Sequence, residues 1–197
     1  SFSSALSGTY ATITRVANEL NKTNENKIVV IDSLNASMGE GLLVLKANEL
    51  KNQGKTIEEI EKEIKALIPK TCSYFTVEQL KYLVRGGRVG KFSGIVGTLL
   101  NIKPVLKVDD NGKLVSHKKV ISRKKSLNEL VNITTEQITD TNYVYICHAV
   151  CEKEATELAN KLKANLNVNP IITDLTQVIG CHTGPGLIAV FFFGNRK

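Results

Sequence analysis

Small hydroxyl residues open the chain and have the side-chain types of an anion site. Residues 3–10 read SSALSGTY, and they begin a segment predicted to be helical over residues 3–20. Free backbone N–H groups, hydroxyl donors and the positive end of the helix dipole converge at a helix start. The segment is therefore either a site for a carboxylate or phosphate, or an ordinary helix N-cap.

A second segment with chemical potential reads RGGRVG over residues 85–90. Its glycines permit a sharp turn, and the guanidinium groups of Arg85 and Arg88 can each grip an oxyanion with two hydrogen bonds. The segment lacks the Gly-Lys-Ser/Thr of a phosphate loop and the spacing of a dinucleotide fingerprint. A binding role and a structural turn with exposed arginines both remain open.

The third segment, residues 180–186, reads GCHTGPG and contains His182. A lone histidine between two strands is more often a hydrogen-bonded core residue than a ligand or a base. Here glycines on both sides permit close approach of a ligand, and Thr183 adds a donor. A triad of Ser7, His182 and Asp32 would make the chain a hydrolase, but the Gly-x-Ser-x-Gly elbow is absent and no spacing supports this alternative.

Four cysteines are few for 197 residues, and their apolar surroundings indicate reduced core thiols in a cytoplasmic protein. Cys147, His148 and Cys151 place three possible zinc ligands close together. A structural zinc site needs a fourth ligand at a matching spacing. None is evident, so we expect no metal.

The net charge of +7 permits a nucleic-acid or anionic-surface partner in principle. Most basic residues alternate with acidic ones, however, and the one dense patch, residues 117–125, has no aromatic side chains among its lysines. We expect no direct nucleic-acid binding, although an acidic protein partner remains open. No apolar run approaches the ~20 residues of a membrane span, so no stable membrane insertion is expected.

The first half of the chain has the pattern of a parallel α/β unit. The apolar run 27–31 predicts a buried strand, and residues 37–52 a helix followed by Gly54. Thr56 opens a further helix with a capping-box pattern, which Pro69 ends. The first strand of the unit is expected upstream of Ser1.

The second half mixes hairpins and helices, which predicts an α+β domain with a mixed sheet. Residues 109–112 (DDNG) are a strong hairpin turn between strands over 102–108 and 114–117. The predicted helices cover residues 78–84, 126–138 and 152–164, and the further predicted strands cover residues 71–75, 143–149, 170–174, 178–182 and 187–193. We predict two domains, residues 1–72 and 73–197.

Five segments of the chain resemble the DegV family in the family's order. They are residues 3–10, IDS at 31–33 with Gly39 and Gly41, LVRGGR at 83–88, LNIKP at 100–104 and HTGPG at 182–186. The resemblance implies an α/β fold of DegV-like two-domain architecture, with a parallel α/β N-terminal lobe, here truncated, and a mixed-sheet α+β C-terminal lobe.

The resemblance also implies a function. Family members of this kind are the fatty acid-binding subunit of bacterial fatty acid kinase. They are lipid carriers without catalytic activity or cofactor, and they present a carboxylate to a separate kinase subunit. Carried over to this chain, Ser7 binds the carboxylate with Ser4, Gly8 and Thr9 around it, and His182 adds a donor. Arg88 lies at the mouth of the site or towards the kinase.

Two departures from the family pattern bear on these expectations. Family members begin with a further strand–helix unit, whose loop also touches the carboxylate. After the hairpin the family commonly has Lys-Val-Arg, where this chain has Lys119-Val120-Ile121. The missing arginine weakens the expectation of kinase docking there.

An acyl chain needs a long apolar slot in addition to one polar anchor. A helix-to-strand apolar surface is expected downstream of the arginine turn, and it is as compatible with plain core packing as with a lining for the slot. Its members are Ile95, Val96, Leu99, Leu100 and Ile102.

Overall fold

The computed structural model describes residues 1–23, 25, 27–88 and 103–196. In chain order its elements are α1 (Thr9–Leu20), α2 (Met38–Asn52), α3 (Ile57–Leu67), the 3₁₀ turn η1 (Ile68–Lys70), β1 (Thr71–Thr76), α4 (Lys81–Arg85), β2 (Val105–Val108), β3 (Leu114–Lys118), α5 (Arg123–Gln137), β4 (Ile138–His148), α6 (Glu152–Leu166), β5 (Ile171–Asp174), α7 (Gln177–Thr183) and β6 (Ile188–Gly194). Among the helices described, none is both long and apolar enough to cross a membrane.

One mixed sheet organises residues 71–194, in the strand order β3-β2-β1-β6-β4-β5. Only β4 and β5 run parallel, and every other described pair is antiparallel. The mixed sheet predicted for the second half of the chain is therefore confirmed. The central strand β6 is buried along its whole length, which explains its unbroken apolar sequence.

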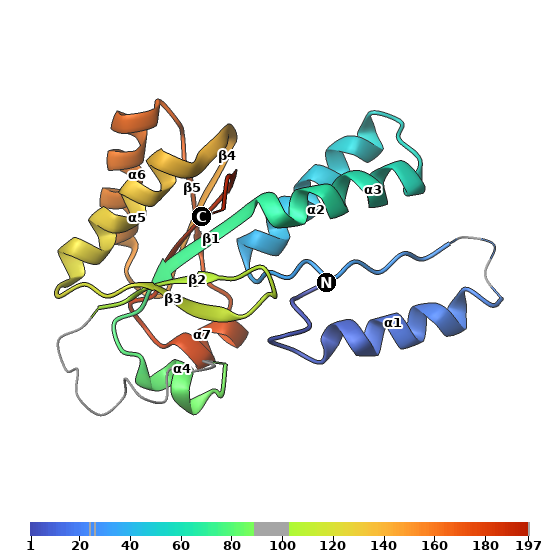
Figure 1. Ribbon diagram of the computed structural model, residues 1–197, viewed down its shortest axis with the longest axis horizontal. Helices are drawn as coiled ribbons and strands as arrows, with labels where there is room; N and C mark the ends of the chain where they lie inside the picture. Colours follow the sequence, from blue (N-terminus) through green and yellow to red (C-terminus); the bar gives the residue numbers. More distant parts are fainter. Residues whose placement is uncertain (24, 26, 89–102, 197) are drawn as a thin grey trace.

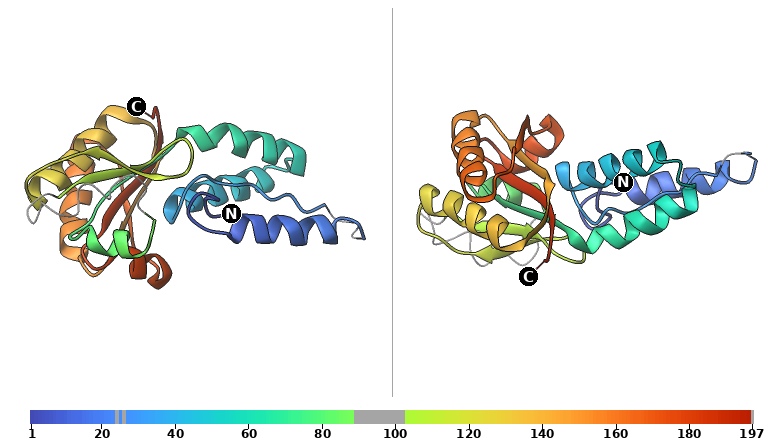
Figure 2. Two further views of the ribbon diagram at one scale, coloured as in Figure 1. Left: turned by 60° about the horizontal axis from the view of Figure 1, so that its bottom comes forward. Right: turned by 90° about the horizontal axis from the view of Figure 1, so that it is seen from above.

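The two faces of the sheet pack against different helices. Val190 and Phe192 of β6 join a core with α5 and α6, whereas Ala189 and Phe191 join a second core with α2. This alternation follows from the two-residue period of a strand. Residues 1–70 extend beside the sheet as an arm of helices and extended chain (Figures 1 and 2). The boundary at residue 72 stays a prediction; the chain passes from η1 into β1 at Thr71.

Several elements lie where the sequence pattern predicts them. Thr56 and Glu59 form the complete capping box at the start of α3. The hairpin turn follows β2 at Asp109, and Gly112 supplies the positive φ of 72° that the turn requires.

The opening helix begins at Thr9, so the prediction of a helix from residue 3 was wrong. Ser3 is held elsewhere: its N–H donates to the Asn35 carbonyl at 2.8 Å and its hydroxyl to the Gly112 carbonyl at 2.9 Å. These bonds tie an irregular turn to the extended segment after α1 and to the β2–β3 hairpin. Ser3, Ser4 and Ser7 therefore precede the helix, and Thr9 is its first residue.

Two strand predictions were also wrong. Residues 27–31 are extended but form no strand, because no strand within the described part of the chain runs beside them. Residues 178–182 lie in helix α7. Its C-cap is Gly184, which has a φ of 73°. Such short apolar runs do not distinguish strand from helix by periodicity.

His117 on β3 packs edge-on against the Tyr74 ring, with centroids 5.2 Å apart. The Tyr74 hydroxyl donates to Gln137 Oε1 at 2.9 Å beneath α5. Burial of the imidazole, and next the positive charge of Lys107, lower the pKa of His117 below its ordinary 6.5. The folded chain thus resists protonation of this side chain.

Acidification is therefore expected to destabilise the fold partly through His117. Below about pH 6.5 the unfolded chain binds a proton that the folded chain resists, so stability falls until the pH passes below the depressed folded pKa. His117→Phe keeps a ring against Tyr74 and removes the titration. Urea unfolding at pH 7.5 and 5.5 should show a smaller loss for the variant than for the wild type. Equal losses would contradict this assignment.

Candidate functional site

A cavity of about 300 Å³ lies between the N-terminal segment and one face of the sheet. The wall residues come from three parts of the chain. These are the N-terminal segment (residues 2–9 and 36–37), the part from β1 to the β2–β3 hairpin, and the part from Leu175 through α7 to β6. They are Phe2, Leu6, Ser7, Thr9, Ala36, Ser37, Ser73, Phe75, Leu83, Arg88, Val108, Leu114, Leu175, Val178, Ile179, His182, Thr183, Leu187, Ala189 and Phe191. Its walls are mainly aliphatic and aromatic, as in sites for small apolar molecules.

The sheet supplies one wall through alternate residues of two neighbouring strands. Ser73 and Phe75 of β1 face Phe191 and Ala189 of β6 across the antiparallel register. All four side chains belong to the face that carries α2 rather than to the face that carries α5 and α6. The Ser73 hydroxyl is already hydrogen-bonded to Asn35 Oδ1 at 2.5 Å, so this wall is effectively apolar.

Polar side chains at the cavity form a connected group. The Ser7 hydroxyl lies 2.8 Å from the Thr9 hydroxyl and accepts the Thr9 N–H at 3.2 Å. Arg88 reaches the same segment, since its Nε donates to the Leu6 carbonyl at 3.4 Å. Its Nη1 donates to the Gly86 carbonyl at 2.6 Å. The arginine thus links the turn before α1 to the end of α4.

His182 joins this group from α7. A β-carbon on Gly86 would lie 3.2 Å from His182 Cγ and even closer to Nδ1, so the imidazole lies against the Gly86 backbone. The prediction of a histidine between two strands was wrong, because the residue lies in the last turn of a helix. Ser7, Thr9, Arg88 and His182 nevertheless all line one cavity.

Ser4 and Gly8 lie near the cavity but are not among its wall residues. The Ser4 N–H donates to the Asp32 carboxylate at 3.2 Å. Gly8 is the N-cap of α1, whose first turn has no acidic residue and whose cap makes no side-chain hydrogen bond. The Thr9 N–H is already bonded to the Ser7 hydroxyl, so the first turn of α1 offers the N–H groups of the residues that follow Thr9.

The predicted apolar surface over Ile95, Val96, Leu99, Leu100 and Ile102 lies outside the described residues. The structure instead provides apolar wall residues that sequence reasoning missed. Phe2 and Leu114 gave no signal, because their partners are remote in sequence. Ala189 and Phe191 are recoverable from the two-residue period of β6 once its buried face is known.

Ser37, like Ser73, is a polar wall residue that sequence reasoning missed. It has a φ of 53° and a ψ of −134°, a conformation that favours glycine, and its hydroxyl lies 3.5 Å from Cys147 Sγ. Backbone strain of this kind often occurs at ligand sites. The sequence marked Ser37 only as the start of a helix.

The structure does not assemble the hydrolase triad from its three candidates. The Ser7 hydroxyl pairs with Thr9 and makes no hydrogen bond to His182. The Asp32 carboxylate accepts the backbone N–H groups of Ser4 and Leu34. Asp32 is thus a local turn residue rather than the partner of a catalytic base.

The cysteine–histidine cluster likewise has other contacts. Cys147 Sγ lies 3.1 Å from the Thr173 hydroxyl, and Cys151 Sγ donates to the Leu187 carbonyl at 3.2 Å. His148 Nδ1 faces Asp174 at 3.7 Å. No group of three or more metal-ligand side chains occurs among residues 1–23, 25, 27–88 and 103–196.

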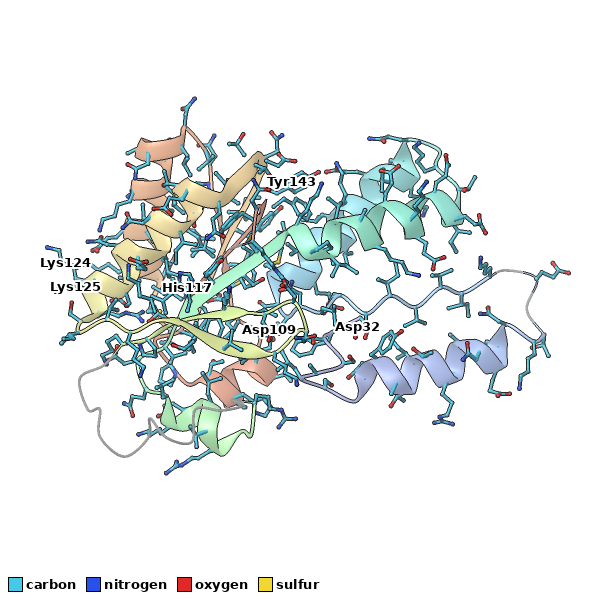
Figure 3. All side chains as sticks on the ribbon, viewed as in Figure 1. Asp32, Asp109, His117, Lys124, Lys125 and Tyr143 are labelled. Atoms are coloured by element: carbon cyan, nitrogen blue, oxygen red, sulfur yellow. The ribbon has the colours of Figure 1, made fainter. Side chains whose placement is uncertain are left out.

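The basic patch after the hairpin lies away from the cavity. Figure 3 shows Lys124 and Lys125 at the outer end of α5, at the left edge of the molecule, whereas Asp32 lies near the middle of the view. Two of its basic side chains are already paired, Lys118 with Glu129 at 2.8 Å and Arg123 with Glu154 at 2.9 Å. The patch therefore does not contribute to the cavity.

The chain is similar to known proteins both in sequence and in structure. A model of the family described as "Uncharacterised protein, DegV family" matches residues 1–195. A DegV domain-containing protein of Clostridium perfringens is 40% identical over 200 residues, which cover 100% of this chain and 69% of the relative.

Two solved structures share the fold. A fatty acid-binding DegV family protein of Streptococcus agalactiae aligns with a TM-score of 0.87 at 31% identity, over 100% of this chain and 69% of that one. The Streptococcus pneumoniae Fatty Acid Kinase (Fak) B3 protein, solved loaded with linoleic acid, aligns with a TM-score of 0.88 at 27% identity. That alignment covers 98% of this chain and 69% of the other.

The four thiols differ in accessibility, which gives a direct test of the described burial. Cys181 is exposed on α7, whereas Cys72 and Cys147 are buried. Burial raises the pKa of Cys72 to about 12 and also raises the pKa of Cys151.

We therefore expect one fast-reacting thiol in the native protein. At pH 8 a disulfide reagent such as DTNB should modify Cys181 first, and Cys181→Ser should remove the fast phase. Labelling followed by peptide mass spectrometry identifies the site. Rapid modification of Cys72, or a fast phase that survives in the variant, would contradict the described burial.

Proposed function

Because the chain belongs to the DegV family, we propose that it binds one long-chain fatty acid in the cavity between its N-terminal segment and its sheet. In this proposal Ser7, Thr9 and His182 hold the carboxylate, and Arg88 closes the polar end. Ser4 holds the turn before α1 in place through its N–H bond to Asp32, and Gly8 contributes through its backbone. The acyl chain then follows the apolar walls, and no cofactor takes part.

The observation that carries the proposal is one cavity with a connected polar group and otherwise mainly apolar walls. A fatty acid has the same division into a charged head and an apolar tail. Hydroxyl, imidazole and guanidinium donors suit a carboxylate, because hydrogen bonds to a charged group are stronger than those between neutral groups. The two solved relatives described above support the same ligand class.

The tail provides most of the affinity in this account. Each buried methylene contributes roughly 0.8 kcal/mol, so about fifteen give on the order of 12 kcal/mol before costs. Immobilising the ligand and ordering side chains removes several kcal/mol of this gain. The polar group therefore selects orientation and head chemistry more than it adds to affinity.

Presentation of the bound carboxylate to a separate, ATP-dependent kinase subunit is the further part of this proposal. It is supported by the likeness to the Streptococcus pneumoniae protein, whose name places it with a fatty acid kinase. The cytoplasm, where ATP is available, is the proposed location. The basic patch over residues 117–125 is a candidate contact for an acidic partner, although Ile121 occupies the position where the family commonly has an arginine.

The hydrolase alternative has no supporting observation. Ser7 and Asp32 are engaged in other hydrogen bonds, and Ser7 lacks the hydrogen bond to a base that activates a serine nucleophile. We therefore assign Ser7 to binding and not to covalent chemistry.

Protein purified from a bacterial host is expected to carry fatty acid at near one-to-one ratio. Denaturation followed by mass spectrometry of the extracted lipid measures it. Delipidated protein should take up palmitate or oleate again. Repeated absence of bound lipid, together with failure to load either acid, would contradict the proposal.

Ser7→Ala should weaken binding of palmitate about tenfold or more, because a hydrogen bond to a charged group contributes roughly 1.5–3 kcal/mol. Methyl palmitate has the same tail without the charge and serves as the matched ligand, so its affinity should change less than about twofold. Competition against a fluorescent fatty acid measures both. An equal loss for acid and ester would show that Ser7 does not contact the head.

A further inference from the structure

Residues 78–86, which include α4, pack against residues 182–186 at the end of α7, and three of the contacts between them involve a glycine. A β-carbon on Gly184 would lie 2.5 Å from Tyr82 Cε2, and one on Gly186 would lie 2.7 Å from the Glu78 β-carbon. The third contact joins Gly86 to the His182 ring. Real β-carbons essentially never come closer than 3.0 Å to another heavy atom. Each of these contacts is therefore possible only because the glycine has no side chain.

These contacts have an ordered register. Residues 78, 82 and 86 meet residues 186, 184 and 182, so the two segments run antiparallel against each other. From Tyr82 to Gly86 the chain makes one helical turn, closed by the Gly86 N–H donating to the Tyr82 carbonyl at 2.9 Å. The glycines thus hold α4 and the end of α7 at a fixed separation.

Gly86 differs from the other two glycines in its backbone. Gly184 and Gly186 have φ angles of 73° and 83°, which favour glycine irrespective of packing. Gly86 has a φ of −70° and a ψ of −9°, which any residue adopts. Its lack of a side chain is therefore required only by the close approach of His182.

The two nitrogen-bearing side chains of the polar group, His182 and Arg88, both contact this residue. The His182 ring lies against the Gly86 α-carbon, and the Gly86 carbonyl accepts the Arg88 guanidinium at 2.6 Å. We propose that Gly86 is a positioning residue for the headgroup site, which sets how far the His182 imidazole stands from Ser7 and the mouth of the cavity. This inference rests on the proposed function and extends it to a residue that contacts no ligand.

Gly86→Ala tests the proposal, with Gly180→Ala as the matched control. Gly180 lies in α7, two residues before His182, and nothing lies within 4 Å of an added β-carbon. The ligand-free proteins are compared first by NMR. The chain has three histidines, and His182→Ala assigns the ring signals of His182. These signals should shift in Gly86→Ala and stay in place in Gly180→Ala; unmoved signals in Gly86→Ala overturn the proposal.

Ligand binding supplies the second readout. Gly86→Ala should lose about tenfold in affinity for palmitate, equivalent to ~1.4 kcal/mol, and less than twofold for methyl palmitate. Gly180→Ala should match the wild type for both ligands. Equal losses for acid and ester in Gly86→Ala would indicate a general packing defect and overturn the positioning role.

A double variant separates the contact from general destabilisation. Removing the ring in His182→Ala leaves room for the added methyl group, so Gly86→Ala should cost little further affinity or thermal stability in that background. Additive losses would show that the methyl group meets something other than His182 and overturn the proposal. If the wild type takes up no fatty acid, the proposed function fails and the headgroup role fails with it. Unmoved ring signals overturn the Gly86 proposal alone.

Discussion

Desolvation of a carboxylate is the constraint on which this account depends. Moving such a group out of water costs several kcal/mol unless protein donors replace the lost hydration. Donors must therefore converge at one end of an otherwise apolar cavity. In the proposed site these donors are the N–H groups in the first turn of α1, the paired hydroxyls of Ser7 and Thr9, the His182 imidazole and the Arg88 guanidinium. The tie from Ser3 to the hairpin holds the first of these against the sheet.

Local rules recovered much of the fold. The capping box at Thr56 and the turn at Asp109 were both predictable, because each depends on a few neighbouring residues with one favoured geometry. The unbroken apolar run of β6 likewise indicated a strand buried on both faces. For the site, residue types alone suggested an anion partner, and the resemblance to a known family, rather than spacing, grouped Ser7, Arg88 and His182.

The errors arose where tertiary contacts overrode local preference. The helix predicted over residues 3–20 lacks its first six residues because Ser3 bonds to Asn35 and Gly112, neither of which is near in sequence. The run 178–182 was wrongly predicted to be a strand and lies in helix α7. Five residues are too few to distinguish the period of a strand from that of a helix. The apolar walls escaped prediction for a similar reason, since Phe2, Leu114 and Phe191 meet only after the sheet has formed. The close approach of His182 to Gly86 is visible only in three dimensions.

A crystal structure of the protein loaded with palmitate tests the central claim most directly. The account predicts continuous electron density for the acyl chain along Phe75 and Phe191, with the carboxylate within hydrogen-bonding distance of the Ser7 hydroxyl and the His182 imidazole. A reversed ligand with its head in the apolar end, or a cavity closed by protein side chains while the lipid lies elsewhere, would contradict it.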